Sequence, residues 1–225
     1  ANAAAATLLR ARASDASVAE SARVSTGVAG DPARDAGLIG ALLRERHGTP
    51  FEHCTFTFLV EAPIFVAREA HRHRIASISE ESSRYREMRP IFYMPAADRP
   101  LTQTGKAMAY EMQAGTQGQR SIVSAYLRLA AEDAWSRYQD MLRVGVAREV
   151  ARMVLPVSIF TAWHLTINAR SLMNFLSLRV RDDTAAYPSK PQIEIQHVAE
   201  DMEAAFAELM PATHSAFVTG GRVAP

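Results

Sequence analysis

The sequence predicts an α+β fold, with a single domain over residues 1–225 that holds a mixed or antiparallel sheet and long helices. Two runs of β-branched and aromatic residues, 54–63 and 157–167, are typical of strands, and a helical pattern follows each without the regular spacing of βαβ units. With 48% hydrophobic and 22% charged residues, the chain of 225 residues is also large enough to bury one sizeable core.

The first part of the chain combines helical and strand patterns. We expect residues 1–14 to be disordered and residues 15–47 to be helical, because Asp31 supplies an N-cap, Pro32 suits the first helical position and an apolar stripe follows. The segment 54–63 alternates Thr with Phe, which predicts a strand with one buried face. A helix restarts at the proline that closes this strand.

The second part of the chain contains the longest predicted helix. The apolar positions of residues 121–144 keep a helical period, and Gly145 ends it. Residues 77–90 are polar and dense in charge, which predicts a loop, and we expect further loop excursions at 96–119 and 180–191. The remaining predicted elements are a short strand at 91–94, a helical piece at 147–155 that Pro156 ends, a strand at 157–167, a helix with Asn168 as its N-cap, and a final amphipathic helix at 191–210.

Composition disfavours several classes of protein. The 25 Lys and Arg residues face 24 Asp and Glu residues, so the net charge of +1 disfavours nucleic acid as a partner. The single cysteine, Cys54, excludes an intramolecular disulfide and a multi-cysteine zinc site, so we expect no metal and a reducing cytoplasm. No run approaches 18 apolar residues, and Arg10 and Arg12 follow the Ala-rich start in the reverse order of a signal peptide. We therefore expect a cytoplasmic protein without a membrane partner.

Residues 72–85 contain a high concentration of charged and hydroxyl-bearing side chains. Arg72, His73 and Arg74 end a helix, where positive charge suits the negative end of the helix dipole, so solvated helix-end charges are one interpretation. That interpretation does not explain why a further arginine and two serine hydroxyls follow in a loop. Converging donors of this kind are what a phosphate group and a polar ring require.

Two further clusters of basic and polar residues follow. Arg148, Glu149 and Arg152 form the first, which precedes Pro156. The second lies on one short helix, and its members Asn168, Arg170, Asn174 and Arg179 are spaced so that we do not expect a single helical stripe. Capping by Asn168 and surface charge for the arginines are the alternative interpretations.

The signature Arg-His-Arg, seven residues and Ser stands here as Arg72-His73-Arg74 through Ser82. With it come SARVSTG, HGTPFEH, APIFVARE, ESSRYREMRPIFYMP, GVAREVARMVLP, NARSLMNFLSLR and PQIEI, which extend through most of the chain. In these stretches the chain resembles the flavin-dependent thymidylate synthases. The resemblance implies one catalytic domain, with the family's α+β fold, that assembles as a homotetramer with active sites shared between subunits.

The resemblance also implies a reaction and its site. The enzyme would methylate C5 of a uridylate, dUMP to dTMP, with methylenetetrahydrofolate as carbon donor, NADPH as reductant and FAD as cofactor. The flavin would be contacted by Ser25, Thr49, Arg72, His73, Arg74, Glu80, Asn168, Arg170 and Asn174. The nucleotide would be contacted by Glu69, Arg72, Glu80, Ser82, Ser83, Arg84, Arg152 and Arg179. Arg84 and Arg152 suit a phosphate, and Arg179 would be catalytic by stabilising an anionic pyrimidine ring.

Three departures from the family pattern bear on the substrate. The family commonly has Asn at the position of Ser79 and often Gln at that of Glu69, and its more compact members carry a His after the matching Arg179 that this chain lacks. The first two positions bear on the sugar, so a UMP C5-methylase of a nucleoside-antibiotic pathway is an alternative. A different class of alternative is a non-catalytic module that binds flavin, a nucleotide or nucleic acid. Cys54 is expected to be a buried small residue and not a nucleophile.

Overall fold

The computed structural model describes residues 3–28, 30–106 and 109–225. The chain forms two compact units, which are described separately. The sheet unit comprises Ala4–Ala62, Val66–Glu81 and Thr161–Pro225, and the long-helix unit is formed mainly by Pro63–Phe65 and Ser82–Phe160. The single domain expected over residues 1–225 stays a prediction.

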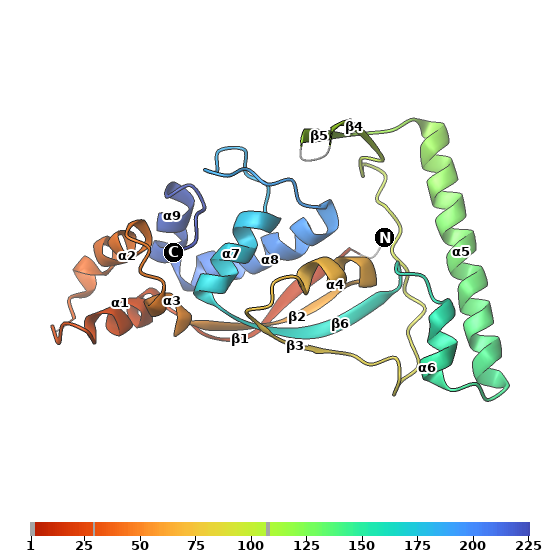
Figure 1. The fold of residues 1–225 in the computed structure, drawn as a ribbon, viewed down its shortest axis with the longest axis horizontal. Helices are drawn as coiled ribbons and strands as arrows, with labels where there is room; N and C mark the ends of the chain where they lie inside the picture. Colours follow the sequence, from red (N-terminus) through yellow and green to blue (C-terminus); the bar gives the residue numbers. More distant parts are fainter. Residues whose placement is uncertain (1–2, 29, 107–108) are drawn as a thin grey trace. The chain divides into compact units, whose positions relative to one another are not determined.

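A four-stranded antiparallel sheet is the centre of the sheet unit (Figure 1). Its strands are β1 (Ala5–Arg12), β2 (Thr55–Pro63), β6 (Phe160–Asn168) and β3 (Ser77–Glu80), in that spatial order. Antiparallel ladders join β1 to β2 and β3 to β6. The backbone N–H of Ala169 donates to the carbonyl of Cys54 at 2.8 Å, and the hydroxyls of Thr57 and Thr166 meet at 2.9 Å, which aligns β2 with β6.

Two of these strands contradict the sequence predictions. β1 lies in the segment expected to be disordered, and β3 lies in the segment 77–90 expected to be a loop. All four residues of β3 are exposed, five of the eight residues of β1 are exposed and none of the eight is fully buried, so neither strand shows an alternation of buried and polar residues. Both are edge strands that backbone pairing with a buried neighbour holds in place. Patterns of hydrophobicity do not reveal such strands.

The helices of the sheet unit differ from the prediction mainly in their breaks. The expected helix at 15–47 is divided into α1 (Asp15–Arg23), a 3₁₀ turn η1 (Pro32–Arg34) and α2 (Asp35–Arg44), although Asp31 caps the turn as predicted. The other helices are α3 (Thr49–Glu52), α4 (Ile64–Ala70), whose first two residues belong to the long-helix unit, α7 (Ala169–Arg179), α8 (Ile193–Leu209) and α9 (Pro211–Thr219). Thus α8 is not the final helix, because Pro211 starts another.

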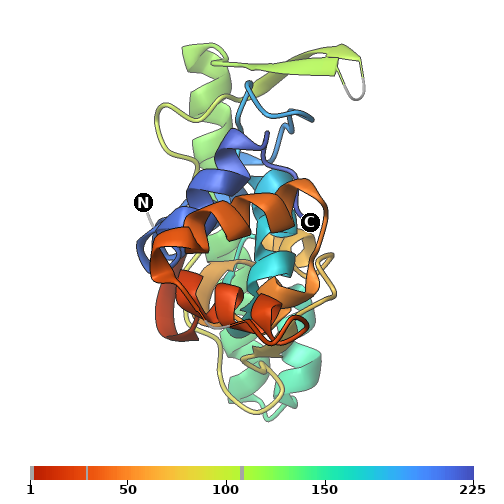
Figure 2. The same cartoon turned by 90° about the vertical axis from the view of Figure 1, so that its left-hand side faces the viewer.

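Buried apolar side chains connect these helices. α8 packs on β1 and on α7, and both helices lie on one side of the sheet (Figure 1). α1, α2 and α9 pack together at one end of the sheet unit, in the foreground of Figure 2. The predicted loop at 180–191 contains neither helix nor strand, and the predicted helix capped by Asn168 is α7.

The long-helix unit is built around α5 (Gln117–Arg143), the predicted longest helix. A capping box of Thr116 and Gln119 begins it, and Gly145 follows it with a positive φ of 85°. α6 (Arg148–Ala151) and the 3₁₀ turn η2 (Arg152–Val154) confirm the helical piece predicted before Pro156. No described helix of the chain is both long and apolar enough to cross a membrane.

The segment 96–119 is not simply a loop. It contains the antiparallel hairpin β4 (Thr102–Lys106) and β5 (Ala109–Gln113), whose connecting residues 107–108 lie outside the described part. β4 is polar and largely exposed, which explains why sequence periodicity does not reveal it. The short strand expected at 91–94 is reduced to one bridge between Phe92 and Ile159.

Candidate active site

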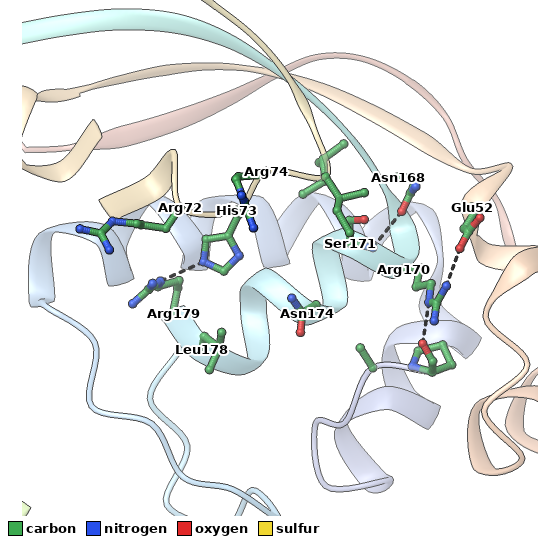
Figure 3. Close-up of a pocket in the computed structure, with 14 residues that line it drawn as sticks. Glu52, Arg72, His73, Arg74, Asn168, Arg170, Ser171, Asn174, Leu178 and Arg179 are labelled. Carbon is green, nitrogen blue, oxygen red and sulfur yellow. Dashed lines mark hydrogen bonds and ion pairs between the residues drawn. The ribbon is translucent and has the colours of Figure 1, made fainter. Parts of the chain in front are cut away.

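A cavity of about 620 Å³ in the sheet unit, called cavity 1 here, brings together two of the predicted clusters (Figure 3). The first is the segment after α4, and the second is α7 with its N-cap. Predicted site residues in the lining are Arg72, His73, Arg74, Asn168, Arg170, Asn174 and Arg179. Segments far apart in sequence therefore converge on one concave, basic surface.

The sheet explains why the two segments meet. β3 and β6 pair antiparallel, so the turn that enters β3 lies beside the residues that leave β6 for α7. Asn168 accepts a hydrogen bond from the N–H of Ser171 at 2.8 Å, which confirms the predicted cap. Asn168, Asn174 and Arg179 all line cavity 1 although their spacing forms no single helical stripe, because the cavity extends along α7 from its N-cap to its last residue.

His73 is held as a neutral hydrogen-bond acceptor. Nε of Arg179 donates to Nε2 of His73 at 3.1 Å, which places the imidazole proton on Nδ1. Burial, and secondly the charge of Arg179, lower the pKa of His73 from 6.5 to about 4. The ring also meets the edge of Phe175, with 4.7 Å between ring centroids. At neutral pH the imidazole therefore carries no charge.

Glu69 lies beside Arg179 and not in the lining. Its Oε1 accepts a hydrogen bond from Nη1 of Arg179 in an ion pair, and the two side chains are 24% and 19% exposed. Among the described residues that line cavity 1, Arg179 is present and Glu69 is not. The predicted contact of Glu69 with a nucleotide stays a prediction.

Arg170 occupies a tightly defined position at the rim of cavity 1. Its Nη1 donates to Glu52 at 2.6 Å, and its Nε donates to the carbonyl of Pro225 at 2.7 Å. A Cβ atom on Gly48 would lie only 2.5 Å from Nε of Arg170, so the glycine makes this approach possible. Sequence reasoning missed both Gly48 and Glu52, although each stands in the quoted stretch HGTPFEH.

A second cavity, of about 730 Å³, shares Arg170 with the first and is called cavity 2 here. The predicted flavin residues Ser25 and Thr49 line it, together with His47 and His53. Glu80, on β3, lines neither of these two cavities and accepts a hydrogen bond from the buried hydroxyl of Thr161 at 2.7 Å. The predicted flavin residues are thus divided between two adjoining cavities and the edge of the sheet.

The remaining predicted nucleotide residues form a separate cluster in the long-helix unit. Nη1 of Arg152 donates to the hydroxyl of Ser83 at 2.9 Å. Nε of Arg84 donates to Glu149 at 3.1 Å, and the N–H of Arg84 donates to Ser82 at 3.4 Å. Two guanidinium groups and two hydroxyls lie together here, which is a donor set suited to a phosphate group.

Cys54 is fully buried, as predicted. Its Sγ lies 3.7 Å from the carbonyl of Ser14, and burial raises the pKa of the thiol. A thiol in this state is a poor nucleophile. Within the part of the chain that the structure describes, no group of three or more His, Cys, Asp and Glu side chains is arranged to hold a metal ion.

Comparison with known proteins agrees with this geometry. The profile of the family described as "Thymidylate synthase complementing protein" matches residues 7–212. Proteins from Streptomyces avermitilis and Streptomyces coelicolor, each named flavin-dependent thymidylate synthase, are 49% identical to the chain over 226 residues, which cover 97% of this chain and 92% of each relative.

A solved structure extends the comparison to the fold. The UMP/dUMP methylase PolB from Streptomyces cacaoi, bound with 5-Br UMP, is similar with a TM-score of 0.94 and 48% identity, over 100% of this chain and 98% of that chain. The predicted α+β fold is therefore confirmed. The chain belongs to the flavin-dependent thymidylate synthase family and is an enzyme of nucleotide C5 methylation that depends on a flavin.

Proposed function

We propose that the enzyme converts dUMP to dTMP, with FAD as cofactor, methylenetetrahydrofolate as carbon donor and NADPH as reductant. The observation that carries the proposal is cavity 1, where the Arg72-His73-Arg74 motif converges with Arg179 and the asparagines of α7. Membership of the family supports the reaction class, and the donor chemistry of the cavity supports the ligands.

The residues of cavities 1 and 2 fit FAD. Guanidinium groups from Arg72, Arg74 and Arg170 suit a diphosphate, and the amides of Asn168 and Asn174 suit a polar ring system that both donates and accepts hydrogen bonds. Ser25 and Thr49 add hydroxyl groups in cavity 2. The bound flavin supplies the redox chemistry that reduces the transferred carbon to a methyl group.

Arg179 is the proposed catalytic residue. An arginine stays protonated at any working pH, so its planar guanidinium can stabilise negative charge on the pyrimidine ring and make C5 nucleophilic. Arg84, Arg152 and the adjacent serines are proposed to hold the phosphate group of the nucleotide. Glu80, held by Thr161, is fixed as an acceptor for the sugar or the flavin.

UMP is the alternative substrate. The relative from Streptomyces cacaoi is a UMP/dUMP methylase, solved with 5-Br UMP and with 5-Br dUMP, and it is 48% identical to this chain in both comparisons. Ser79 precedes Glu80 on β3 and pairs with His164 across the β3–β6 ladder, and its side chain is shorter than the asparagine common in the family. A site that is merely roomy discriminates weakly between a ribose and a deoxyribose.

The proposed assembly is a homotetramer with shared active sites, in the cytoplasm. Ile122, Tyr126 and Leu129 form an i, i+4, i+7 stripe on α5, and their side chains are 54%, 67% and 58% exposed. A stripe of this kind supports a second copy of the chain as the partner of α5. Sedimentation of the purified protein measures the assembly directly.

Parallel assays of dUMP and UMP with FAD, NADPH and methylenetetrahydrofolate test the reaction. We expect a yellow protein whose flavin is bleached by NADPH and that methylates dUMP. Preference for UMP would replace the main proposal with the alternative. A colourless protein that takes up no FAD, or a yellow protein that methylates neither nucleotide, would contradict the proposal.

A further inference from the structure

The guanidinium of Arg179 is engaged through two different nitrogen atoms. Nη1 donates to the carboxylate of Glu69, and Nε donates to Nε2 of His73 at 3.1 Å (Figure 3 shows the second contact). Glu69 lies on α4 and His73 follows it, whereas Arg179 is the last residue of α7. Two neighbouring acceptors from one segment therefore hold the end of a side chain from another.

These two contacts leave most of the donors of Arg179 for a ligand. A guanidinium has five N–H groups, of which the contacts with Glu69 and His73 use two. Arg179 lines cavity 1, while Glu69 is not among the described lining residues. The carboxylate thus engages the guanidinium without itself lining the cavity.

The surroundings give the arrangement rigidity. The Glu69 and Arg179 side chains are only 24% and 19% exposed, so solvent screens their attraction less than that of a surface pair. His73 is itself fixed by its edge contact with Phe175, which is 2% exposed. A long and otherwise flexible arginine side chain is therefore confined to one orientation.

We propose that Glu69 is a positioning residue that orients Arg179 toward the nucleotide, with His73 as the second support. This inference rests on the proposed function, because it assumes that Arg179 meets the pyrimidine ring. This role of Glu69 acts through Arg179 and is distinct from the direct contact with the nucleotide that the family resemblance implies for Glu69. A displacement of about 1 Å in a catalytic group can cost about 100-fold in rate, so the orientation of this guanidinium matters for turnover.

Two substitutions separate the geometry of Glu69 from its charge. Glu69→Gln keeps an oxygen that accepts the hydrogen bond from Nη1, whereas Glu69→Leu removes the acceptor. We expect Glu69→Leu to lower kcat roughly 10- to 100-fold relative to Glu69→Gln, by more than any accompanying change in the dissociation constant of the nucleotide.

The matched control is another partly buried ion pair in the sheet unit. Arg23 and Asp35 are paired at 2.6 Å and are 17% and 15% exposed, and neither lines cavity 1 within the described chain. We expect Asp35→Asn and Asp35→Leu to alter thermal stability without changing kcat. Equal losses of kcat in the Glu69 and Asp35 variants would reduce Glu69 to a purely structural role and overturn the proposal.

A spectroscopic measurement tests whether Glu69 holds Arg179 in place, and it requires no turnover of substrate. In flavin-loaded protein labelled with ¹⁵N-arginine, the Nε–H signal of Arg179, assigned through Arg179→Lys, reports its hydrogen bond to His73. We expect slow hydrogen exchange in the wild type and in Glu69→Gln, and exchange at least about tenfold faster in Glu69→Leu. Unchanged exchange in Glu69→Leu would overturn the proposal.

The two readouts also distinguish failure of this inference from failure of the proposed function. A wild-type protein that methylates neither dUMP nor UMP contradicts the function, and the exchange measurement still decides whether Glu69 holds Arg179. An active wild type with an equally active Glu69→Leu variant contradicts the inference alone. Tighter nucleotide binding in both Glu69 variants, without loss of kcat, would show that the carboxylate competes with the substrate and would also overturn it.

Discussion

Replacing Gly48 by alanine gives a sharp test of how cavities 1 and 2 are built. The new Cβ would lie 2.5 Å from Nε, 2.7 Å from Cζ and 2.9 Å from Cδ of Arg170. Ordinary van der Waals contact begins near 3.4 Å, so the guanidinium must move by about 0.9 Å. Gly48 has φ −76° and ψ −31°, which alanine adopts without strain, so the effect is steric.

The displacement has a larger consequence for the ligand than for folding. A shift of this size stretches the hydrogen bonds of Arg170 to Glu52 and Pro225, now 2.6 and 2.7 Å, beyond useful length. The Arg170–Glu52 pair is exposed, at 46% and 41%, so its loss changes the free energy of unfolding by at most about 1 kcal/mol. If Arg170 binds FAD, loss of one charged hydrogen bond weakens FAD binding by about tenfold or more, roughly 1.5 kcal/mol.

The assay is titration of the apoprotein with FAD, followed by flavin fluorescence, together with thermal unfolding. Gly37→Ala is the control, because a Cβ at Gly37 meets nothing within 4 Å and the residue lies inside α2. We expect Gly37→Ala to keep the affinity for FAD and to gain about 0.5–1 kcal/mol of stability. An affinity for FAD in Gly48→Ala within twofold of the wild type would refute the reasoning.

Three further predictions concern single side chains. Arg179→Lys is expected to lower kcat by about 100-fold with a much smaller change in KM, because a compact ammonium does not reproduce a planar contact; a change confined to KM in steady-state kinetics would contradict it. Because the pKa of His73 is about 4 in the folded state and about 6.5 when unfolded, the unfolded chain binds an extra proton between these values, so stability falls as the pH drops from 6.5 to 4. After a discount for partial exposure, we expect the free energy of unfolding measured in urea to fall over this range by about 1–2 kcal/mol more in the wild type than in His73→Gln. Equal losses in the two proteins would refute the assignment. Cys54→Ala is expected to keep activity and to cost about 1 kcal/mol of stability, and an inactive but folded variant would restore the thiol as a nucleophile.

Local patterns were sufficient for the elements whose own residues are buried periodically. β2, β6 and α7 follow from alternation, helical period and the Asn168 cap, because each of these signals lies within about ten residues of sequence. β1, β3 and the β4–β5 hairpin were missed, because their residues are largely exposed and backbone pairing defines them. The break between α1 and α2 did have a local signal, because Gly27, Gly30 and the Asp31-Pro32 pair interrupt the segment that was predicted as helical throughout.

For the site, the sequence by itself determined the chemical groups: the Arg72-His73-Arg74 motif, the amides and arginines of α7, and the family to which they point. Tertiary structure alone decided which of these groups meet. Arg179 lies 106 residues from His73 and 110 from Glu69, and only the packing of α7 beside α4 and the turn that follows it brings them into contact. The close approach of Arg170 to Gly48 arises in the same way. Residue identity sets what a side chain can donate or accept, but the direction in which it points depends on contacts between distant segments, which no local pattern encodes.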